Sequence, residues 1–162
     1  TASVVNAMKA HPNEMIIQEK ACLALQLLAP ADGRREVSMV ASGAVASVVA
    51  AMQAHVGDPN VQEEACAAIA AIVKHGGGDR ATVVASVSGV TAILNAIAAH
   101  PISSSVQKQG LRALCALTDF DDASMPELPR AQTEPLLALA KESSAEDCSA
   151  LADKLMDRMT SE

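Results

Sequence analysis

A set of residues recurs about every 45 positions, and this period constrains the fold more than any other feature of the chain. Three histidines are spaced by 44 and 45 residues, and the three glutamines that follow them keep the same two intervals. The recurring residues are His11, His55 and His100, with Gln18, Gln62 and Gln107. Several markers in one phase are typical of a repeat protein, in which each unit packs on its neighbours. We therefore expect a solenoid of stacked repeats.

Hydrophobic spacing predicts helices within each period. Apolar residues follow helical spacing after Gly43 and again after Gly89. His75 precedes three glycines, a run that ends a helix. A shorter helix is expected to begin near residues 32–35 and again near residues 79–80. Each period is thus predicted to hold two long helices and a short one.

Short polar side chains predict where the long helices begin. Ser42 and Ser88 precede apolar stretches and are predicted N-caps, because a serine oxygen accepts hydrogen bonds from the first N–H groups of a helix. Asp58 is a further predicted N-cap. It is followed by Pro59 at the first helical position, where the N–H that proline lacks would have no partner within the helix.

Two segments of the chain carry the residues of a known repeat. Residues 17–25 read Ile-Gln-Glu-Lys-Ala-Cys-Leu-Ala-Leu, and residues 61–69 read Val-Gln-Glu-Glu-Ala-Cys-Ala-Ala-Ile. Together with the Gly-[Ala/Val]-x-x-[Val/Ile]-[Val/Leu] pattern of the preceding helix, this resembles the armadillo repeat. The variant with Ala-Met-x-Ala-His is also similar to armadillo arrays in several large protist proteins and in some leucine-rich-repeat kinases.

The armadillo resemblance covers essentially the whole chain and implies an all-α fold. The implied architecture is a right-handed α–α superhelix of about three and a half repeats of about 45 residues. We expect a single armadillo-repeat domain over residues 1–162. Its predicted parts are a partial repeat (1–30), two repeats (31–75 and 76–118) and a degenerate C-terminal capping repeat (119–162).

Charge and composition argue against several function classes. The chain has a formal net charge of −7, whereas nucleic acids and anionic membranes are bound by clustered Lys and Arg. We therefore predict no nucleic-acid and no membrane partner. Apolar stretches are too short for a membrane span, and the first residues lack the basic segment of a signal peptide. The four cysteines lie within predicted helices, which indicates a reducing, cytoplasmic compartment.

No catalytic or cofactor motif is present, so we predict that the protein is not an enzyme and binds no cofactor. The sequence lacks a nucleophile elbow, a phosphate-binding loop, a dinucleotide fingerprint and the paired-Cys and paired-His metal motifs. The recurring histidines are not a predicted metal site, because packed helices lie roughly 10 Å apart and zinc needs ligands at about 2 Å. We expect these imidazoles to meet free carbonyl groups at helix ends.

Two of the cysteines occupy one repeat position. Cys22 and Cys66 are replaced by Leu111 in the next repeat, which indicates a buried site where cysteine acts as a small hydrophobic residue. Cys115 and Cys148 also lie at apolar phases. A reactive thiol is the alternative interpretation.

The resemblance also implies where a partner binds. In an armadillo stack the third helix of each repeat lines the concave face, and here it is the helix with the Gln-Glu-x-Ala-Cys motif. The implied partner-binding residues are Glu19, Leu23, Leu27, Glu63, Ala67, Lys74, Lys108 and Arg112. They place acid toward the N-terminal end of the array and base toward its C-terminal end. We hypothesise that this face accepts an amphipathic helix or a peptide with opposed charges from another protein. The alternative is that these charges are solvated or paired within the chain.

One binding mode of the armadillo family lacks its residues here. Nuclear-import adaptors clamp an extended peptide with a Trp and, four residues further on, an Asn. The matching Trp positions hold Leu23, Ala67 and Arg112, and the matching Asn positions hold Leu27, Ala71 and Ala116. This departure argues against the import-adaptor mode.

The first residues of the chain match the middle of a later helix. Residues 3–8 resemble residues 47–52, and a terminal repeat of a solenoid needs a polar outer face. We therefore expect Val4, Val5 and Met8 to form an apolar edge that self-associates or that upstream residues cover. The alternatives to a protein-binding module are accordingly a self-associating structural element, which would form a homo-oligomer, and a regulatory fragment of a larger multidomain protein.

The last residues predict a capping helix. Residues 144–147 resemble a capping box, and Leu151, Leu155 and Met159 then form an apolar stripe. Residues 119–130 are rich in Asp and Pro and are predicted to form an extended connection between repeats. The alternative for this segment is an acidic recognition loop.

Overall fold

The computed structural model describes residues 1–29, 42–75, 87–118, 129–142 and 146–160, and this part of the chain contains eight helices and no strand. The helices are α1 (Ala2–Ala10), α2 (Met15–Leu28), α4 (Ala44–Ala54), α5 (Pro59–His75), α7 (Val87–Ala99), α8 (Ser104–Thr118), α9 (Arg130–Glu142) and α10 (Glu146–Thr160). The expected all-α fold is confirmed. The short helices expected near residues 32–35 and 79–80, and residues 119–128 of the predicted connection, lie outside the described residues.

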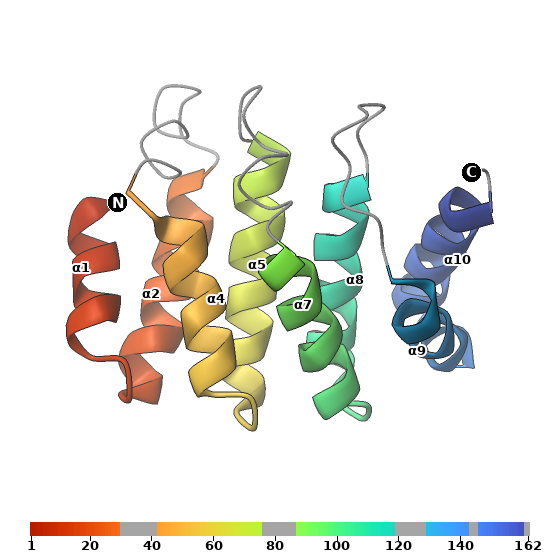
Figure 1. The fold of residues 1–162 in the computed structure, drawn as a ribbon, viewed down its shortest axis with the longest axis horizontal. Helices are drawn as coiled ribbons and strands as arrows, with labels where there is room; N and C mark the ends of the chain where they lie inside the picture. Colours follow the sequence, from red (N-terminus) through yellow and green to blue (C-terminus); the bar gives the residue numbers. More distant parts are fainter. Residues whose placement is uncertain (30–41, 76–86, 119–128, 143–145, 161–162) are drawn as a thin grey trace.

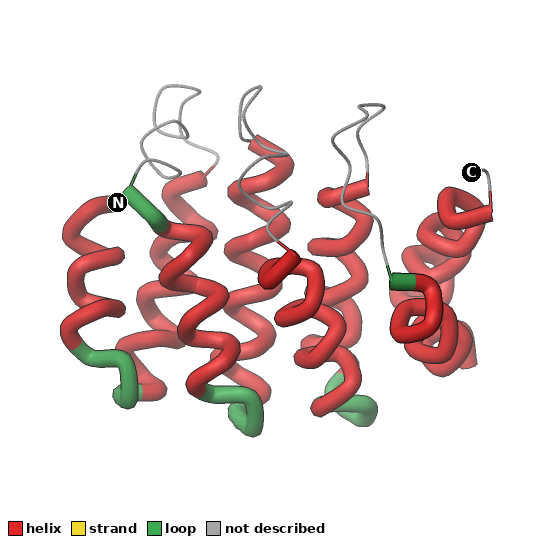
Figure 2. The backbone as a smooth tube through the Cα atoms, viewed as in Figure 1, coloured by secondary structure: helices red, strands yellow, loops and turns green. Residues whose placement is uncertain are grey.

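The helices are stacked in two rows, as a solenoid requires. One row consists of α1, α4, α7 and α9, and the second consists of α2, α5, α8 and α10 (Figure 1). Three short turns at one edge of the stack join α1 to α2, α4 to α5 and α7 to α8 (Figure 2). No helix among the described segments is long and apolar enough to cross a membrane.

A buried glutamine at the same position of three repeats ties each helix pair together. In each case the side-chain Nε2 donates to two carbonyl oxygens near the end of the preceding helix. The pairs are Met8 and His11 for Gln18 (3.0 and 2.8 Å), Met52 and His55 for Gln62 (2.8 and 2.8 Å), and Ile97 and His100 for Gln107 (2.7 and 2.9 Å). The last carbonyl groups of a helix have no partner within it, and the glutamine meets this need in each of the first three helix pairs.

The recurring histidines link one repeat to the next. His55 Nε2 lies 2.8 Å from the carbonyl oxygen of Pro12, and His100 Nε2 lies 2.7 Å from that of Val56. Pro12 directly follows His11, and Val56 directly follows His55, so each imidazole reaches the equivalent turn of the preceding repeat. The expectation that these side chains meet carbonyl groups is confirmed for His55 and His100.

The predicted helix starts are correct at one site and wrong at two. Asp58 Oδ1 accepts hydrogen bonds from the backbone N–H groups of Asn60 (3.0 Å) and Val61 (2.9 Å), which confirms it as the cap of α5. Ser42 is not the N-cap of α4, because the chain turns into the helix one residue later, at a glycine that adopts a φ of 74°. Ser88 lies inside α7, which already begins at Val87.

The packing of α7 on α8 requires a glycine. A β-carbon on Gly110 would lie 2.6 Å from Cγ1 of Ile97, a distance that the packed side chain does not allow without a shift. In the two earlier repeats a methionine stands at the Ile97 position and an alanine at the Gly110 position, namely Met8 with Ala21 and Met52 with Ala65. The branched side chain and the missing β-carbon therefore compensate for each other.

The N-terminal edge differs from the expectation. Val5 and Met8 are 1% and 2% exposed, because α1 buries this face against α2 and α4. Val4 is half-buried and packs against the same core. The prediction that Val5 and Met8 form an exposed self-association edge is therefore wrong.

The C-terminal hairpin uses contacts that occur once. Arg130 donates from its guanidinium to the carbonyl oxygen of Met159, and Lys141 forms an ion pair with Asp153. The predicted apolar stripe of α10 does face the protein, since Leu155 and Met159 are buried and Leu151 is half-buried. The predicted capping box at residues 144–147 lies outside the described side chains.

Candidate functional site

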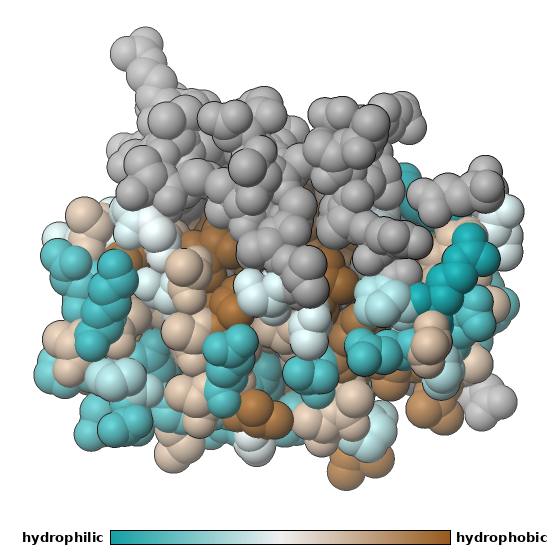
Figure 3. All heavy atoms as spheres, viewed as in Figure 1, coloured by the Kyte–Doolittle hydropathy of each residue, from teal (hydrophilic) through white to brown (hydrophobic). Residues whose placement is uncertain are grey.

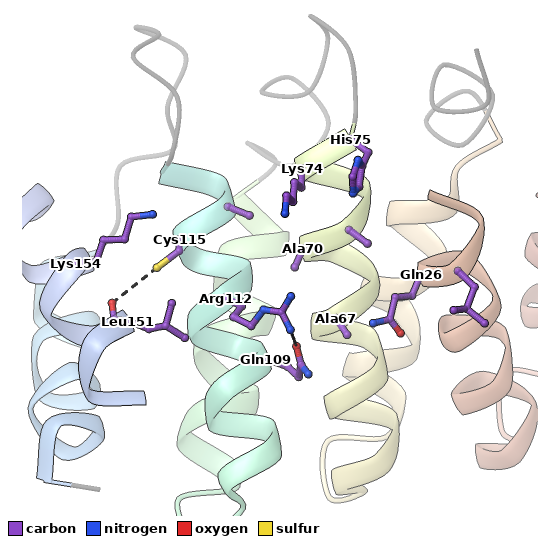
Figure 4. A pocket seen from close by; sticks show the side chains of 13 residues that line it. Gln26, Ala67, Ala70, Lys74, His75, Gln109, Arg112, Cys115, Leu151 and Lys154 are labelled. Carbon is purple, nitrogen blue, oxygen red and sulfur yellow. Dashed lines mark hydrogen bonds between the residues drawn. The ribbon is translucent and has the colours of Figure 1, made fainter. Parts of the chain in front are cut away.

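A groove of about 600 Å³ crosses the row formed by α2, α5, α8 and α10. Its lining consists of Gln26, Leu27, Ala67, Ala70, Ala71, Lys74, His75, Gln109, Arg112, Cys115, Ala116, Leu151 and Lys154. These side chains come from all four helices (Figure 4). Stacking places the equivalent face of each helix beside the next, so residues far apart in the sequence share one surface. We call this surface the α5–α8 groove.

Small side chains form the floor of the groove between α5 and α8. Ala67 and Ala70 of α5 are 4% and 9% exposed, and Ala71 and Ala116 are half-buried. An alanine side chain ends at its β-carbon, so this floor leaves room above the helix backbones for the side chains of a ligand. Larger polar residues stand around it.

The charged residues that line the groove are basic. They are Lys74 at the end of α5, Arg112 of α8 and Lys154 of α10, and His75 lies beside Lys74. No Asp or Glu is among the described residues of the lining, although the chain as a whole carries a net charge of −7. Arg112 donates one hydrogen bond to Gln109 Oε1 (3.2 Å), and a guanidinium has five N–H donors. The groove is thus a basic surface on an acidic protein.

The structure separates the eight predicted partner-binding residues into two sets. Leu27, Ala67, Lys74 and Arg112 line the groove. Glu19, Leu23, Glu63 and Lys108 lie on the same helices but outside its lining. The two sets differ in their position along the helices. Glu19, Glu63 and Lys108 lie near the N-terminal ends, whereas Leu23 lies near the middle of α2.

Acidic side chains gather where α2 packs on α5. Lys20 Nζ lies 2.6 Å from Glu19 Oε1, and the hydrogen bond and charge of Glu19 raise the pKa of Lys20. Burial raises the pKa of Glu64, and the nearby charges of Glu63 and Glu19 add to this effect. The alternative expectation, that these charges are paired within the chain, therefore holds for Glu19.

Nine of the thirteen described lining residues are absent from the predicted set, and two groups among them are informative. Gln26 and Cys115 stand at equivalent positions, three residues after a predicted one, and the i, i+3 neighbourhood of a helix face would have included them. Leu151 and Lys154 come from α10, whose sequence departs from the repeat pattern. No signal in the repeat pattern pointed to that helix as part of the face.

All four cysteines are buried thiols. Burial raises the pKa of Cys22 and of Cys66 to about 12 each, so both stay protonated thiols near neutral pH. Cys115 and Cys148 are also buried, and Cys115 Sγ lies 3.8 Å from the carbonyl oxygen of Leu151. Within the described segments, no group of three His, Cys, Asp or Glu residues is placed to hold a metal ion.

Comparison with known families agrees with the architecture. The model of a protein family described as LRRK2 ARM repeat matches residues 1–142 of the chain. The match covers the first three helix pairs and α9. No curated protein and no solved structure matches the chain.

Proposed function

This chain belongs to the LRRK2 armadillo-repeat family, and we propose that it holds an acidic segment of another protein in the α5–α8 groove. Armadillo repeats form a scaffold fold that typically binds other proteins, and the groove is where equivalent faces of successive repeats meet.

The charge of the groove carries the proposal. Lys74 and Arg112 lie on neighbouring helices and line one cavity, and no acidic residue of the described chain lines it with them. Complementary charge favours encounter with an acidic segment and disfavours a basic one. Both residues are exposed, so a ligand reaches them without displacing core side chains.

The shape of the groove supports a peptide rather than a small molecule. Its volume of about 600 Å³ is in the range of small-molecule pockets, but it is partly open to solvent and its lining extends over four helices, which suits an extended segment. Arginine is enriched at binding hot spots, and Arg112 is the arginine of this surface. A segment that lays apolar side chains on the floor and a carboxylate against Arg112 satisfies both features.

The distribution of charge along the helices predicts how the segment lies. Glu19 and Glu63 stand near the N-terminal ends of α2 and α5, whereas Lys74 stands at the end of α5. A carboxylate of the ligand is repelled by the first pair and attracted by Lys74 and Arg112. The acidic residues of the partner are therefore expected to lie toward the C-terminal ends of α5 and α8.

A selection from random peptides tests this function without knowledge of the partner. Peptides displayed on phage are selected on the immobilised chain, and their Asp and Glu content is compared with that of the unselected library. We expect enrichment of acidic peptides with apolar residues. A Lys74→Glu/Arg112→Glu variant is expected to bind the selected peptides about tenfold more weakly or worse.

The control carries the same change of charge outside the groove. Lys20→Glu/Lys141→Glu alters two exposed lysines of α2 and α9 and is expected to keep most of the affinity. Circular dichroism and thermal melting confirm that both variants fold. Equal loss in both double variants, or no enrichment of acidic peptides, would contradict the proposal.

A second candidate function is self-association through the turns that join the helix pairs. Val56 and Ile102 lie in the turns after α4 and α7 and are 45% and 99% exposed, and hydrophobic residues show at this rim of the stack (Figure 3). Sedimentation velocity over a range of concentrations tests it. Dimerisation that Ile102→Asp abolishes would support self-association, and a monomer at all concentrations would rule it out.

A further inference from the structure

A second cavity lies on the other row of helices, between α1 and α4. It has a volume of about 240 Å³. Its lining consists of Met8, Lys9, Pro12, Gln18, Gly43, Ala46, Ser47, Ala50 and Ala51. We call it the α1–α4 crevice. None of its lining residues belongs to the α5–α8 groove, so the two surfaces are separate.

One end of the α1–α4 crevice is polar. The hydroxyl oxygen of Ser47 is buried and has no hydrogen-bond partner among the described residues. Gly43, one helical turn earlier, is the N-cap of α4, where the helix dipole places positive potential. Lys9 Nζ lies 4.0 Å from where a β-carbon on Gly43 would stand. A donor hydroxyl, an ammonium group and the start of α4 therefore line the same crevice, with the ammonium group beside the helix N-terminus.

The rest of the α1–α4 crevice is apolar. Met8, Pro12, Ala50 and Ala51 supply aliphatic surface, and the side-chain Nε2 of Gln18 already donates to the carbonyl oxygens of Met8 and His11 at the end of α1. A ligand that fits this division has a charged head for the polar end and a short apolar stem. The buried hydroxyl of Ser47 is costly without a partner, so a head group that accepts its hydrogen bond relieves that cost.

The next repeat provides an internal comparison. The equivalent cavity between α4 and α7 is lined by Met52, Gln53, Val56, Gln62, Ala92, Asn95 and Ala96 and has a volume of about 20 Å³. In it, Gln53 replaces Lys9, Ala92 replaces Ser47 and the larger Asn95 replaces Ala50. The repeat geometry alone therefore does not produce an open, charged crevice. The open, charged crevice depends on Lys9, Ser47 and Ala50, which are found only between α1 and α4 in this comparison.

From these observations we infer that the α1–α4 crevice binds a carboxylate carried on a short apolar stem. Ser47 donates its hydroxyl hydrogen to the carboxylate, Lys9 pairs with its charge, and Met8 and Ala50 contact the stem. The volume lies below the roughly 300–1,000 Å³ of ordinary ligand pockets, so the ligand is about the size of one amino-acid residue. Two sources offer this chemistry: a free short-chain carboxylic acid and the C-terminal residue of a peptide.

An NMR titration of the full chain tests the inference with 4-methylpentanoate as the probe. Saturable shifts are expected in the backbone signals of Gly43, Ala46 and Ser47, with a Kd of about 1 mM, the range for so few ligand atoms. The uncharged 4-methylpentanamide is expected to bind at least about tenfold more weakly. No saturable shift at about 10 mM acid, or equal binding of acid and amide, would overturn the inference.

The repeats supply variants that are matched to this test. Ser47→Ala and Ala50→Asn each introduce the residue of the equivalent position in α7, so both are expected to fold as the wild type does. Ser47→Ala should weaken acid binding about fivefold or more, and Ala50→Asn should abolish it by filling the crevice. Unchanged binding of the acid to Ala50→Asn would place the acid elsewhere and refute the site.

A peptide arm distinguishes the two sources. A short peptide that ends in leucine is titrated with a free C-terminus and as its C-terminal amide. Tighter binding of the free peptide than of 4-methylpentanoate assigns the crevice to a protein C-terminus. Binding of the small acid without binding of either peptide assigns it to a free carboxylic acid. Both results support the carboxylate site, whereas binding of the amidated peptide as strongly as the free one contradicts it.

Discussion

The first three helix pairs and the last pair are held together by different means. In the first three pairs, one glutamine satisfies two carbonyl groups at the end of the preceding helix, with almost the same distances each time. In the α9–α10 pair, the contacts are an arginine on a carbonyl group of the last turn and a lysine–aspartate ion pair. The first solution is buried and repeats, whereas the second is partly exposed and occurs once.

This difference explains why the first three helix pairs can be recognised in the sequence and the last pair cannot. A contact that every repeat needs leaves the same residue at the same phase, and Gln18, Gln62 and Gln107 are visible for that reason. A contact that is needed once leaves no pattern. Exposed ion pairs also contribute little, about 0–1 kcal/mol, so the α9–α10 pair depends on its apolar stripe more than on its charges.

The largest expected effect is on the buried glutamine. Gln62→Ala removes both hydrogen bonds to α4 and leaves a cavity at a side chain that is 1% exposed. We expect a loss of about 3 kcal/mol in the free energy of unfolding, measured by chemical denaturation. Gln132→Ala removes an exposed glutamine of α9 and serves as the control, with an expected change within about 0.5 kcal/mol. Similar losses in the two variants would show that the buried glutamine contributes no more to stability than an exposed one.

The next effect tests the coupling of Gly110 and Ile97. Gly110→Ala brings a β-carbon to 2.6 Å from Ile97 Cγ1, and we expect it to destabilise the protein by about 1–2 kcal/mol. Adding Ile97→Met restores the pairing of the earlier repeats and should recover most of that loss. The double-mutant cycle from denaturation curves gives the coupling energy. Additive effects of the two substitutions would mean that the residues do not compensate for each other.

A third effect is the pH dependence of stability that the buried thiol of Cys66 causes. Burial raises the pKa of Cys66 to about 12, above the ordinary thiol value of 9.0, so the folded chain keeps a proton that the unfolded chain loses at alkaline pH. The stabilisation is therefore fully present below about pH 9 and is lost as pH rises toward 12. From about pH 8 to about pH 10, the wild type should lose about 1 kcal/mol more than Cys66→Ala. An equal loss would show that the thiol ionises within the fold.

The smallest effect is expected in the last helix pair. Arg130→Ala removes a hydrogen bond to Met159, and we expect a change of about 0.5 kcal/mol or less in global stability. Hydrogen exchange should become faster in α9 and α10 while the protection of α4 and α5 stays the same, because the hairpin opens as a local unit. A loss of global stability as large as that of Gln62→Ala would show that the α9–α10 pair unfolds together with the first three helix pairs.

The sequence predicted the features that recur in each repeat, but it missed those that depend on how adjacent helices pack. Period, helix pairs and the phase of the glutamines follow from spacing alone. The burial of Val5 and Met8 does not, because their likeness to the middle of a later helix suggested an open apolar edge, whereas α1 turns this face toward α2 and α4. The predicted N-caps of α4 and α7 were wrong because the two Ser-Gly pairs behave differently. Gly43 adopts a positive φ and precedes α4, whereas Gly89 lies inside α7, and residue spacing does not distinguish the two cases.

The candidate site shows the same limit. Four of its residues were foreseen, namely Leu27, Ala67, Lys74 and Arg112, because the face of a helix follows from its period. Acid and base were both expected on this face, but the acidic residues Glu19 and Glu63 share the helices and lie outside the lining, so only the basic part of the expected charge pattern belongs to the groove. Which part of a helix face becomes a groove depends on how the neighbouring helices pack against it, and a repeat pattern does not specify that packing.

A double-mutant cycle across the groove tests whether an acidic segment binds against Arg112. The affinity of a selected acidic peptide is measured by calorimetry for the wild type and for Arg112→Gln, with the peptide and with the same peptide carrying one Glu→Gln change. We predict a coupling energy of about 1 kcal/mol or more for one glutamate of the peptide, because that carboxylate contacts the guanidinium. A coupling energy near zero for every glutamate would contradict the placement of an acidic segment in the α5–α8 groove.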